Sequence, residues 1–418
     1  MAKIALVFPK STFLTDPMTW MPLSLMYLGA QLEAQGHQTE FFDMSVHNLP
    51  KDGNFDQLWV SATTPQVAAV REISDITKNW SKTFTVLGGP IVTVTPHEYF
   101  PFDLRVAGEG DHPSTIEAIL VAAAFQTKTV WDAPEHDNLD WVLPPIRRWS
   151  NLYHSYMSDR HGNQHRMTSM FITRGCSFNC AFCATGRGGK VWGDKVRFEP
   201  MEIVEAQMRE IRDLGFDGVA HYDDLFIMQR QRAEKLFELH KKYGLFWRCF
   251  TRTDLICKFG GKEYLQKMQD SGLIEIFVGI ESADNQIKNN IHKGTTIEQD
   301  TKVVEWCKEL GIICKCSFII GLPGETWESL NKTRDWLLKY LPERVGLNAF
   351  IPFSGTPIVM HRDEYDIGWD VDLPDEYFLK GKTGTGEALV HTSHLTREEI
   401  DKFWHELDQE ITGLGIKP

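Results

Sequence analysis

The stretch TRGCSFNCAFC, residues 173–183, places Cys176, Cys180 and Cys183 within one short loop. The loop directly follows a predicted strand, Ser169–Thr173. Thiolates so close together can each bind a different iron of a four-iron cluster, and the fourth iron then has no protein ligand. An open metal position suits catalysis, because a substrate must coordinate there. The spacing therefore predicts a 4Fe–4S cluster with one open iron.

The strand before this loop is the first of a series. From Met167 onward, apolar runs of strand length alternate with segments of helical periodicity, which predicts a parallel sheet covered by helices. Six such units in about 185 residues favour a partial (β/α)6 barrel of the TIM type over a complete eight-stranded one. Active sites of such barrels assemble at the carboxyl ends of the strands, where the cysteine loop falls. The expected strands are Ser169–Thr173, Gly218–Tyr222, Phe246–Thr251, Glu275–Ile280, Ile312–Ile320 and Val345–Phe350.

The first 120 residues show the same alternation. Strands are expected at Lys3–Phe8, Thr39–Asp43, Asp56–Ala62, Phe84–Leu87 and Leu104–Ala107, with helices between them. This pattern predicts an α/β domain built on a doubly wound parallel sheet, which binds its ligands at the carboxyl ends of the strands. We therefore expect a first domain at 1–125, a linker at 126–165, the barrel at 166–355 and a C-terminal extension at 356–418.

Composition limits the class of partner. The chain carries a formal net charge of −13, and an acidic protein lacks the basic face on which nucleic-acid binding rests. No apolar run approaches the length of a membrane span, and the strand-like N-terminus does not resemble a signal peptide. We expect a cytoplasmic protein that acts on a small molecule, with no membrane or nucleic-acid partner.

Other interpretations of the cysteines are weaker. A disulfide framework is typical of small secreted chains, and structural zinc needs four ligands, whereas the next cysteine, Cys249, comes 66 residues after Cys183. Cys314 and Cys316 alternate on one predicted strand and so share a face. With Cys249 they either line the barrel interior as a second cluster site or pack in the core, and core packing is the commoner role.

The Cys-x-x-x-Cys-x-x-Cys spacing, with Phe182 before the last cysteine, resembles the signature of the radical S-adenosylmethionine (SAM) superfamily. The resemblance implies that SAM chelates the open iron and is cleaved to a 5′-deoxyadenosyl radical that abstracts hydrogen. It also implies an electron donor such as flavodoxin or ferredoxin.

Further matches imply SAM contacts. Glu281-Ser282 resembles the GxES element of the family, and Lys293 lies in a basic element downstream. Residues 317–325 resemble the GxIxGxxE element but carry Ser317 in place of the first glycine and a glutamate, Glu325, one place late, so only Ile319 and Gly321 are carried over. Asp223 and Asp224 either face the cavity or cap a helix. The implied SAM-binding residues are Phe182, Tyr222, Arg252, Glu281, Ser282, Lys293, Ile319 and Gly321.

The first domain resembles the cobalamin-binding domain of a radical SAM subfamily. Its expected strands end in small or polar residues in the order that the subfamily shows. The Asp-x-His-x-x-Gly element that supplies a histidine to cobalt elsewhere is absent, and His47 is interpreted as a surface residue, so cobalamin is expected to bind without a histidine ligand. The alternative is a retained fold that no longer binds cobalamin. The implied cobalamin-binding residues are Pro22, Leu23, Ser61, Thr63, Thr64, Gly88, Gly89, Gly108 and Glu109.

These resemblances imply a cobalamin-dependent methyltransferase that acts on an unactivated carbon. Two alternatives remain open. The first is a radical SAM enzyme for rearrangement, cyclisation or oxidation, and the second is an iron–sulfur redox sensor. A methylthiotransferase is excluded, because that family carries further cysteines upstream and this chain has none before Cys176.

Overall fold

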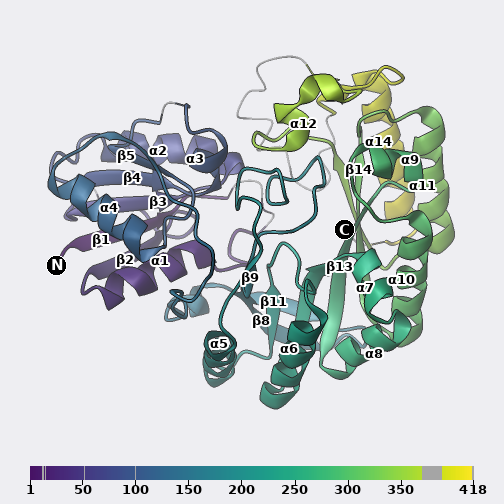
Figure 1. Ribbon diagram of the computed structural model, residues 1–418, viewed down its shortest axis with the longest axis horizontal. Helices are drawn as coiled ribbons and strands as arrows, with labels where there is room; N and C mark the ends of the chain where they lie inside the picture. The colour runs from purple at the N-terminus through teal and green to yellow at the C-terminus, as the bar shows by residue number, and fades with distance from the viewer. Residues whose placement is uncertain (12–13, 15, 51, 99, 370–387, 417–418) are drawn as a thin grey trace.

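The computed structural model describes residues 1–418 except 12–13, 15, 51, 99, 370–387 and 417–418. Figure 1 shows an N-terminal domain with strands between two layers of helices, beside a larger domain whose curled sheet carries helices on its outer side. The two domains meet along the cysteine-containing segment near β9 (Thr173–Arg174).

The sheet of the N-terminal domain is parallel and has the order β2-β1-β3-β4-β5-β6. Its strands are β1 (Lys3–Phe8), β2 (Gln38–Asp43), β3 (Gln57–Ser61), β4 (Phe84–Gly88), β5 (Leu104–Ala107) and β6 (Thr129–Asp132). Helices α1 (Leu23–Ala34) and α4 (Pro113–Ala124) pack in the core on one face, and α2 (Val67–Thr77) and α3 (Pro90–Val94) in the core on the other. Helices on both faces confirm the predicted doubly wound sheet.

The second sheet has the order β15-β14-β13-β12-β11-β8-β7, in which only β7 is antiparallel to its neighbour. The strands are β7 (Ser155–Ser158), β8 (Gln164–Met170), β11 (Gly218–His221), β12 (Phe246–Thr251), β13 (Leu273–Glu281), β14 (Ile313–Ile320) and β15 (Arg344–Ala349). The helices of its outer layer include α5 (Met201–Asp213), α6 (Arg230–Tyr243), α7 (Thr253–Phe259), α8 (Lys262–Asp270), α10 (Ile297–Leu310) and α11 (Trp327–Tyr340). The run from β8 to β15 confirms the partial (β/α)6 barrel.

The segment expected to be a linker, 126–165, contains strands near both ends. β6 completes the edge of the N-terminal sheet, and β7 forms an antiparallel pair with β8. Irregular backbone therefore occupies a shorter stretch between them. Isolated tetrapeptides such as Thr129–Asp132, mostly exposed and without a sustained period, give too little pattern to predict a strand from sequence.

The C-terminal extension joins the barrel. Its helix α14 (Arg397–Gly413) buries Ile400, Phe403, Trp404 and Leu407 in the core of the barrel domain. Residues 370–387 of the predicted extension lie outside the described residues. Within the part of the chain that is described, no helix is both long and apolar enough to cross a membrane.

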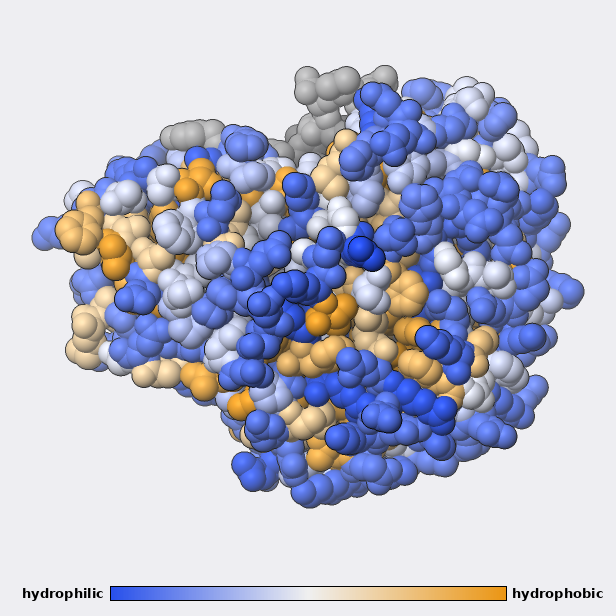
Figure 2. Space-filling model, in the orientation of Figure 1, coloured by the Kyte–Doolittle hydropathy of each residue, from blue (hydrophilic) through white to orange (hydrophobic). Residues whose placement is uncertain are grey.

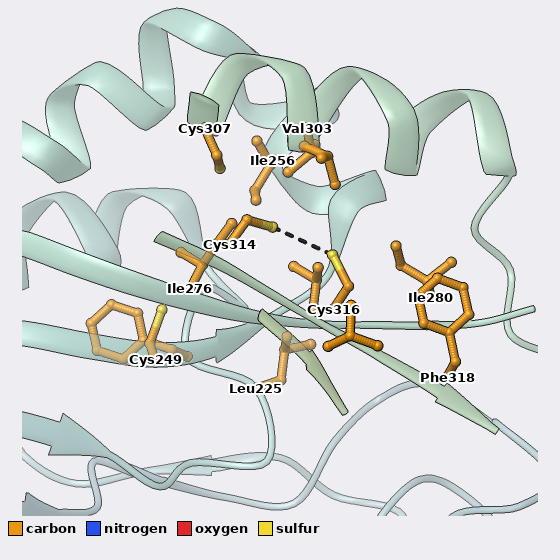
Figure 3. Packing of buried hydrophobic residues seen from close by; sticks show 14 of the residues in the cluster. Leu225, Cys249, Ile256, Ile276, Ile280, Val303, Cys307, Cys314, Cys316 and Phe318 are labelled. Carbon is orange, nitrogen blue, oxygen red and sulfur yellow. Dashed lines mark hydrogen bonds between the residues drawn. The ribbon is translucent and has the colours of Figure 1, made fainter. Parts of the chain in front are cut away.

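Alternation along the barrel strands separates an outer and an inner face. Cys249, Cys314 and Cys316 are fully or almost fully buried in one hydrophobic core, where Cys314 and Cys316 lie on the side of Val303 and Cys307 of α10 (Figure 3). Core packing is thereby confirmed for these cysteines. The face that they share is the outer, helix-covered one and not the barrel interior, so the interior carries the alternate residues of the same strands.

Candidate active site

The cysteine loop is fastened at its base by a short antiparallel pair. Thr173 and Arg174 of β9 pair with Phe198 and Arg197 of β10 (Arg197–Phe198). Gly175, with φ +88°, follows at once, and a Cβ there would lie 2.5 Å from the carbonyl oxygen of Lys195. Glycine is therefore required where the two ends of the loop cross.

Two aspartates after β11 hold the start of the loop. Asp223 Oδ1 accepts hydrogen bonds from the backbone N–H groups of Ile172 (2.8 Å) and Thr173 (2.6 Å). Asp224 Oδ2 accepts from Gly175 N–H at 3.3 Å. Neither aspartate caps a helix, so the helix-cap alternative is wrong for both. They tie the first barrel strands to the cysteine loop, and burial raises the pKa of Asp223 to about 7.

The three cysteine thiols lie together at the end of the barrel. Cys180 is buried, while Cys176 and Cys183 are half-buried. Burial raises the pKa of Cys176 to about 11, and the neighbouring Cys183 and Cys180 add to the rise. Among the described residues, no three His, Cys, Asp or Glu side chains converge on a single ion. The three thiols as cluster ligands therefore stay a prediction from their spacing.

Arg252, predicted to contact SAM, lies against the same loop. Its Nη1 is 3.5 Å from Cys180 Sγ, and its guanidinium stacks 3.6 Å from the ring centroid of Phe178. Nη2 donates to the carbonyl oxygen of Lys293 at 2.5 Å. A fixed cation is thus held beside a predicted cluster ligand.

Glu281 and Lys293 form a buried ion pair at this end of the barrel, with Nζ 2.7 Å from Oε1. Although burial opposes it, the Glu281 carboxylate raises the pKa of Lys293. Glu281 has φ +68°, next to a register shift between β13 and β14. A Cβ at Gly279 would lie 2.1 Å from the Glu281 carboxylate, so the missing side chain makes room for the pair.

Three of the other predicted SAM residues, Phe182, Ser282 and Gly321, make contacts that can be described. Phe182 lies 5.6 Å from Lys293 Nζ and belongs to the cysteine end of the site. Ser282 is buried and accepts a hydrogen bond from Asp284 N–H, which gives it a role in the turn. Gly321 has φ +92° and donates its N–H to Glu325 Oε2 at 2.6 Å. Glu325, which lies one place late for the family element, therefore closes the turn after β14.

At the carboxyl edge of the N-terminal sheet, some of the predicted cobalamin-binding residues are accessible to a ligand and others are buried. Ser61, Thr63, Thr64, Gly88, Gly89 and Gly108 are half-exposed there, at the ends of β3, β4 and β5. Pro22 and Leu23 are buried instead, and Leu23 belongs to the core. A Cβ at Gly89 (φ +91°) would lie 2.6 Å from Ala62 O, so the chain itself requires that glycine. At Gly88 a Cβ would meet Val106 O at 3.7 Å, an ordinary contact distance, so a Cβ fits there without a clash.

Glu109 is held between the domains. Arg174 Nη1 donates to Glu109 Oε1 at 2.8 Å, and Arg174 Nη2 donates to Asp111 Oδ2 at 2.6 Å. The other oxygen of Glu109 pairs with Arg197, and all four side chains are largely buried. Its contact with cobalamin stays a prediction. Sequence reasoning missed this network, because only the fold brings residue 109 beside residue 174.

Trp20 is a second residue that sequence reasoning missed. It follows β1 of the N-terminal domain, yet its ring lies 5.1 Å from that of Tyr222, edge to face, at the end of β11. It also packs against a small hydrophobic cluster nearer the start of the barrel strands, formed by Met157, Met167, Ile274 and Ile313. The N-terminal domain thus contributes a side chain to the inner face of the barrel.

Comparisons with known proteins agree with this geometry. Residues 170–337 match the radical SAM superfamily, and residues 10–117 match the B12 binding domain. The chain is a radical SAM enzyme with a B12-binding domain. These two domains bind SAM, a 4Fe–4S cluster and cobalamin. The thiols beside Arg252, the Glu281–Lys293 pair and the small residues at the ends of β3 and β4 fit those groups.

Similar proteins span most of the chain. An uncharacterized methyltransferase of Pyrococcus horikoshii is 26% identical over 92% of this chain and 86% of its own. The anaerobic magnesium-protoporphyrin IX monomethyl ester cyclase of Rubrivivax gelatinosus is 26% identical over 76% of this chain and 62% of its own. Among solved structures, the radical SAM methyltransferase TsrM of Kitasatospora setae, with tryptophan and a SAM analogue bound, has a TM-score of 0.70 at 16% identity over 89% of this chain and 79% of that one. At that identity the likeness to TsrM establishes the fold.

Proposed function

We propose that this enzyme is a cobalamin-dependent methyltransferase that acts on an unactivated carbon of a small-molecule substrate. One observation carries the proposal. Arg174, two residues before Cys176, is ion-paired with Glu109 and Asp111, which directly follow Gly108 at the carboxyl end of β5. The expected cobalamin edge and the cysteine loop are therefore fastened to each other, as a reaction that needs both cofactors requires.

The chain's own residues hold and orient the reactants. When bound, SAM, the cluster and cobalamin supply the methyl group and the radical chemistry that opens a C–H bond. Arg252, Glu281 and Lys293 present charged groups to SAM beside Cys180. Trp20 and Tyr222 cover the inner face of the barrel from the side of the N-terminal domain and help to exclude water from it.

The proposal includes an electron donor and a reducing compartment. Reductive cleavage of SAM needs one electron, so an electron donor such as flavodoxin or ferredoxin is required. The free state of all eight cysteines agrees with a reducing compartment such as the cytoplasm.

A second candidate function is rearrangement, cyclisation or oxidation on the same radical SAM core. The similarity to the cyclase of Rubrivivax gelatinosus favours it, although that relative is covered over only 62% of its length. The two candidates differ in the fate of the methyl group.

Anaerobic reconstitution with iron, sulfide and hydroxocobalamin tests the proposal. The wild-type protein should take up both groups and show cobalamin absorption with no histidine ligand in the electron paramagnetic resonance spectrum of the cobalt(II) form. Mass spectrometry of products, with methyl-labelled SAM, should find the label in the substrate. Replacing Cys176, Cys180 and Cys183 together by Ala should remove the cluster and 5′-deoxyadenosine formation while cobalamin is retained. A wild-type protein that takes up no cobalamin would leave the second candidate.

A further inference from the structure

We infer that the inner face of the barrel binds a substrate with a flat apolar body that ends in an anionic group, a carboxylate or a phosphate. The inference rests on the proposed function in one respect, since it takes the inner face to be part of the active site. Its evidence is a single row of side chains that crosses neighbouring strands.

The row is fixed by strand register. Phe250 of β12 pairs with Phe277 of β13, Phe277 pairs with Lys315 of β14, and Lys315 pairs with Arg344 of β15. Residues paired across parallel strands point to the same face of the sheet. Since Cys249, Cys314 and Cys316 face the helices, these residues face the inside of the barrel.

The first part of the row is aromatic. Tyr222 lies 5.8 Å from Phe250, and Phe250 lies 4.9 Å from Phe277, measured between ring centroids. Trp20 extends the series from the N-terminal domain. All four rings are only half-buried, whereas alternate residues of the same strands on the outer face, such as Trp247 and Ile276, are fully buried. Apolar side chains that line a concave face without being covered are typical of a small-molecule site.

Small residues lie on the carboxyl side of this row. Two residues further along each strand stand Gly279, Ser317 and Gly346, which are paired with one another across β13, β14 and β15. The room beside Gly279 is taken by the Glu281–Lys293 pair, which borders the row on the SAM side, while Ser317 and Gly346 place no bulky side chain there. Figure 2 shows hydrophobic residues gathered near the middle of the molecule, over the region where β9 and β13 are labelled in Figure 1.

In the second part of the row, positively charged side chains outnumber the carboxylates beside them. Glu275 is fully buried and forms ion pairs with both nearby arginines. Its carboxylate oxygens lie 2.6 Å from Arg344 Nη1 and 3.4 Å from Arg248 Nη1. Lys315 has no ion-pair or hydrogen-bond partner among the described residues, and its Nζ lies 5.7 Å from the centroid of Phe277. Three cations therefore share one carboxylate. Burial lowers the pKa of Lys315; Glu275 opposes this shift, and the two arginines add to it.

An anion beside Lys315 would supply a counter-charge, and the rings of Phe277 and Phe250 would hold a flat body next to it. This geometry predicts selectivity for aromatic acids over neutral aromatic compounds of the same shape. The selectivity should depend on Lys315 more than on the arginines, because the arginines already have a partner.

Equilibrium dialysis tests the inference without turnover. The probes are 1-naphthaleneacetate, 1-naphthyl phosphate and the neutral 1-naphthaleneacetamide. The protein is the holoenzyme saturated with S-adenosylhomocysteine, so that the amino-acid site beside the cluster is filled. At least one of the two anions should bind wild-type protein tenfold or more tightly than the amide, and the stronger anion identifies the group. Equal binding of acids and amide, or no binding of any probe at millimolar concentration, would overturn the inference.

Matched variants locate the site. Lys315→Met keeps the length of the side chain but removes the charge, and it should abolish the preference for the anion. Lys235→Met, at an exposed position on α6, should keep the preference. Phe277→Ala should weaken anion and amide alike. Cluster and cobalamin spectra of each variant are recorded beside the binding constants, so loss of the proposed function, seen as missing cobalamin, is distinguishable from loss of this site. A preference that survives in Lys315→Met would disprove the assignment.

Discussion

At the residue scale, the site concentrates conformations and charges that a stable core avoids. Glu281 adopts a positive φ that L side chains rarely take, and its carboxylate is buried against Lys293. Such a conformation costs about 1–3 kcal/mol and persists only where the surroundings enforce it. Here the absence of a side chain at Gly279 and the Lys293 ammonium enforce it. The position of the carboxylate beside Cys180 gives this cost a functional reason.

Glu281→Gln should weaken SAM binding without removing the cluster. The charged acceptor contributes a hydrogen bond of about 1.5–3 kcal/mol, which corresponds to roughly a tenfold to hundredfold loss of affinity. Calorimetry with SAM measures the loss, and iron content and the visible spectrum monitor the cluster. Glu117→Gln, at an exposed position on α4, is the control. Unchanged SAM affinity in Glu281→Gln would assign Glu281 a purely structural role.

Glu325 should make stability depend on pH. Burial raises its pKa to about 8, while the unfolded chain restores an ordinary value near 4.5. The unfolded state therefore binds fewer protons than the native state between these values, so the free energy of unfolding falls as pH rises from about 5 to 8. Glu325→Gln, which can still accept the N–H of Gly321, should flatten this slope and raise Tm by a few degrees at pH 8.5 relative to wild type. Parallel Tm curves from pH 5 to 9 for the two proteins would contradict the assignment.

At the scale of elements, most of the correct predictions came from two patterns: the alternation of strand-like and helix-like segments, and the spacing of the cysteines. Periodic apolar runs located strands β1 to β5, β8 and β11 to β15, and the cysteine spacing located the loop. Strands β6 and β7 were missed, because each is short and sits in an aperiodic stretch. The glycines at the end of β4 were located, but Gly89 also has a structural role that was not foreseen, and its contact with cobalamin stays a prediction. Gly89 makes room for Ala62 of the same chain, a contact that no local pattern encodes.

The two glycines after β4 should respond differently to substitution. Gly89→Leu places a side chain in a left-handed conformation against the backbone of Ala62, so it should lower Tm by several degrees whether or not cobalamin is present. Gly88→Leu meets no atom closer than 3.7 Å at Cβ and should fold normally, but it should lose cobalamin retention. Absorption after gel filtration measures retention, and thermal scans of the cobalamin-free proteins measure stability. Full cobalamin retention in Gly88→Leu would place the ligand away from this strand end.

At the scale of the whole molecule, the two domains are joined where each presents its cofactor residues. The joint is ionic: Arg174 and Arg197 lie against Glu109 and Asp111. Desolvation and the two carboxylates act in opposite directions on Arg174, and the carboxylates raise its pKa overall. A buried charge network of this kind adds little net stability, but it fixes one geometry, because breaking it leaves uncompensated charge. The sequence contains all four residues and gives no sign of their pairing, since the partners lie 63 or more positions apart.

The ion-pair network between the domains should therefore control how the two cofactor sites are positioned relative to each other more than whether each cofactor binds. Arg174→Met leaves Glu109 and Asp111 buried without their shared partner, a loss of about 3–5 kcal/mol when one side of a buried pair is removed. The domains should separate in part, with a larger radius of gyration in X-ray scattering and faster proteolysis between them. Adding Asp111→Asn to that variant removes one uncompensated charge and should recover part of the stability. Methyl transfer should stay low in both variants while 5′-deoxyadenosine formation and cobalamin content persist.

Full methyl transfer in the double variant would show that the cofactors meet without this joint. A compact Arg174→Met protein would show that apolar contacts such as Trp20 with Tyr222 are enough to hold the domains together.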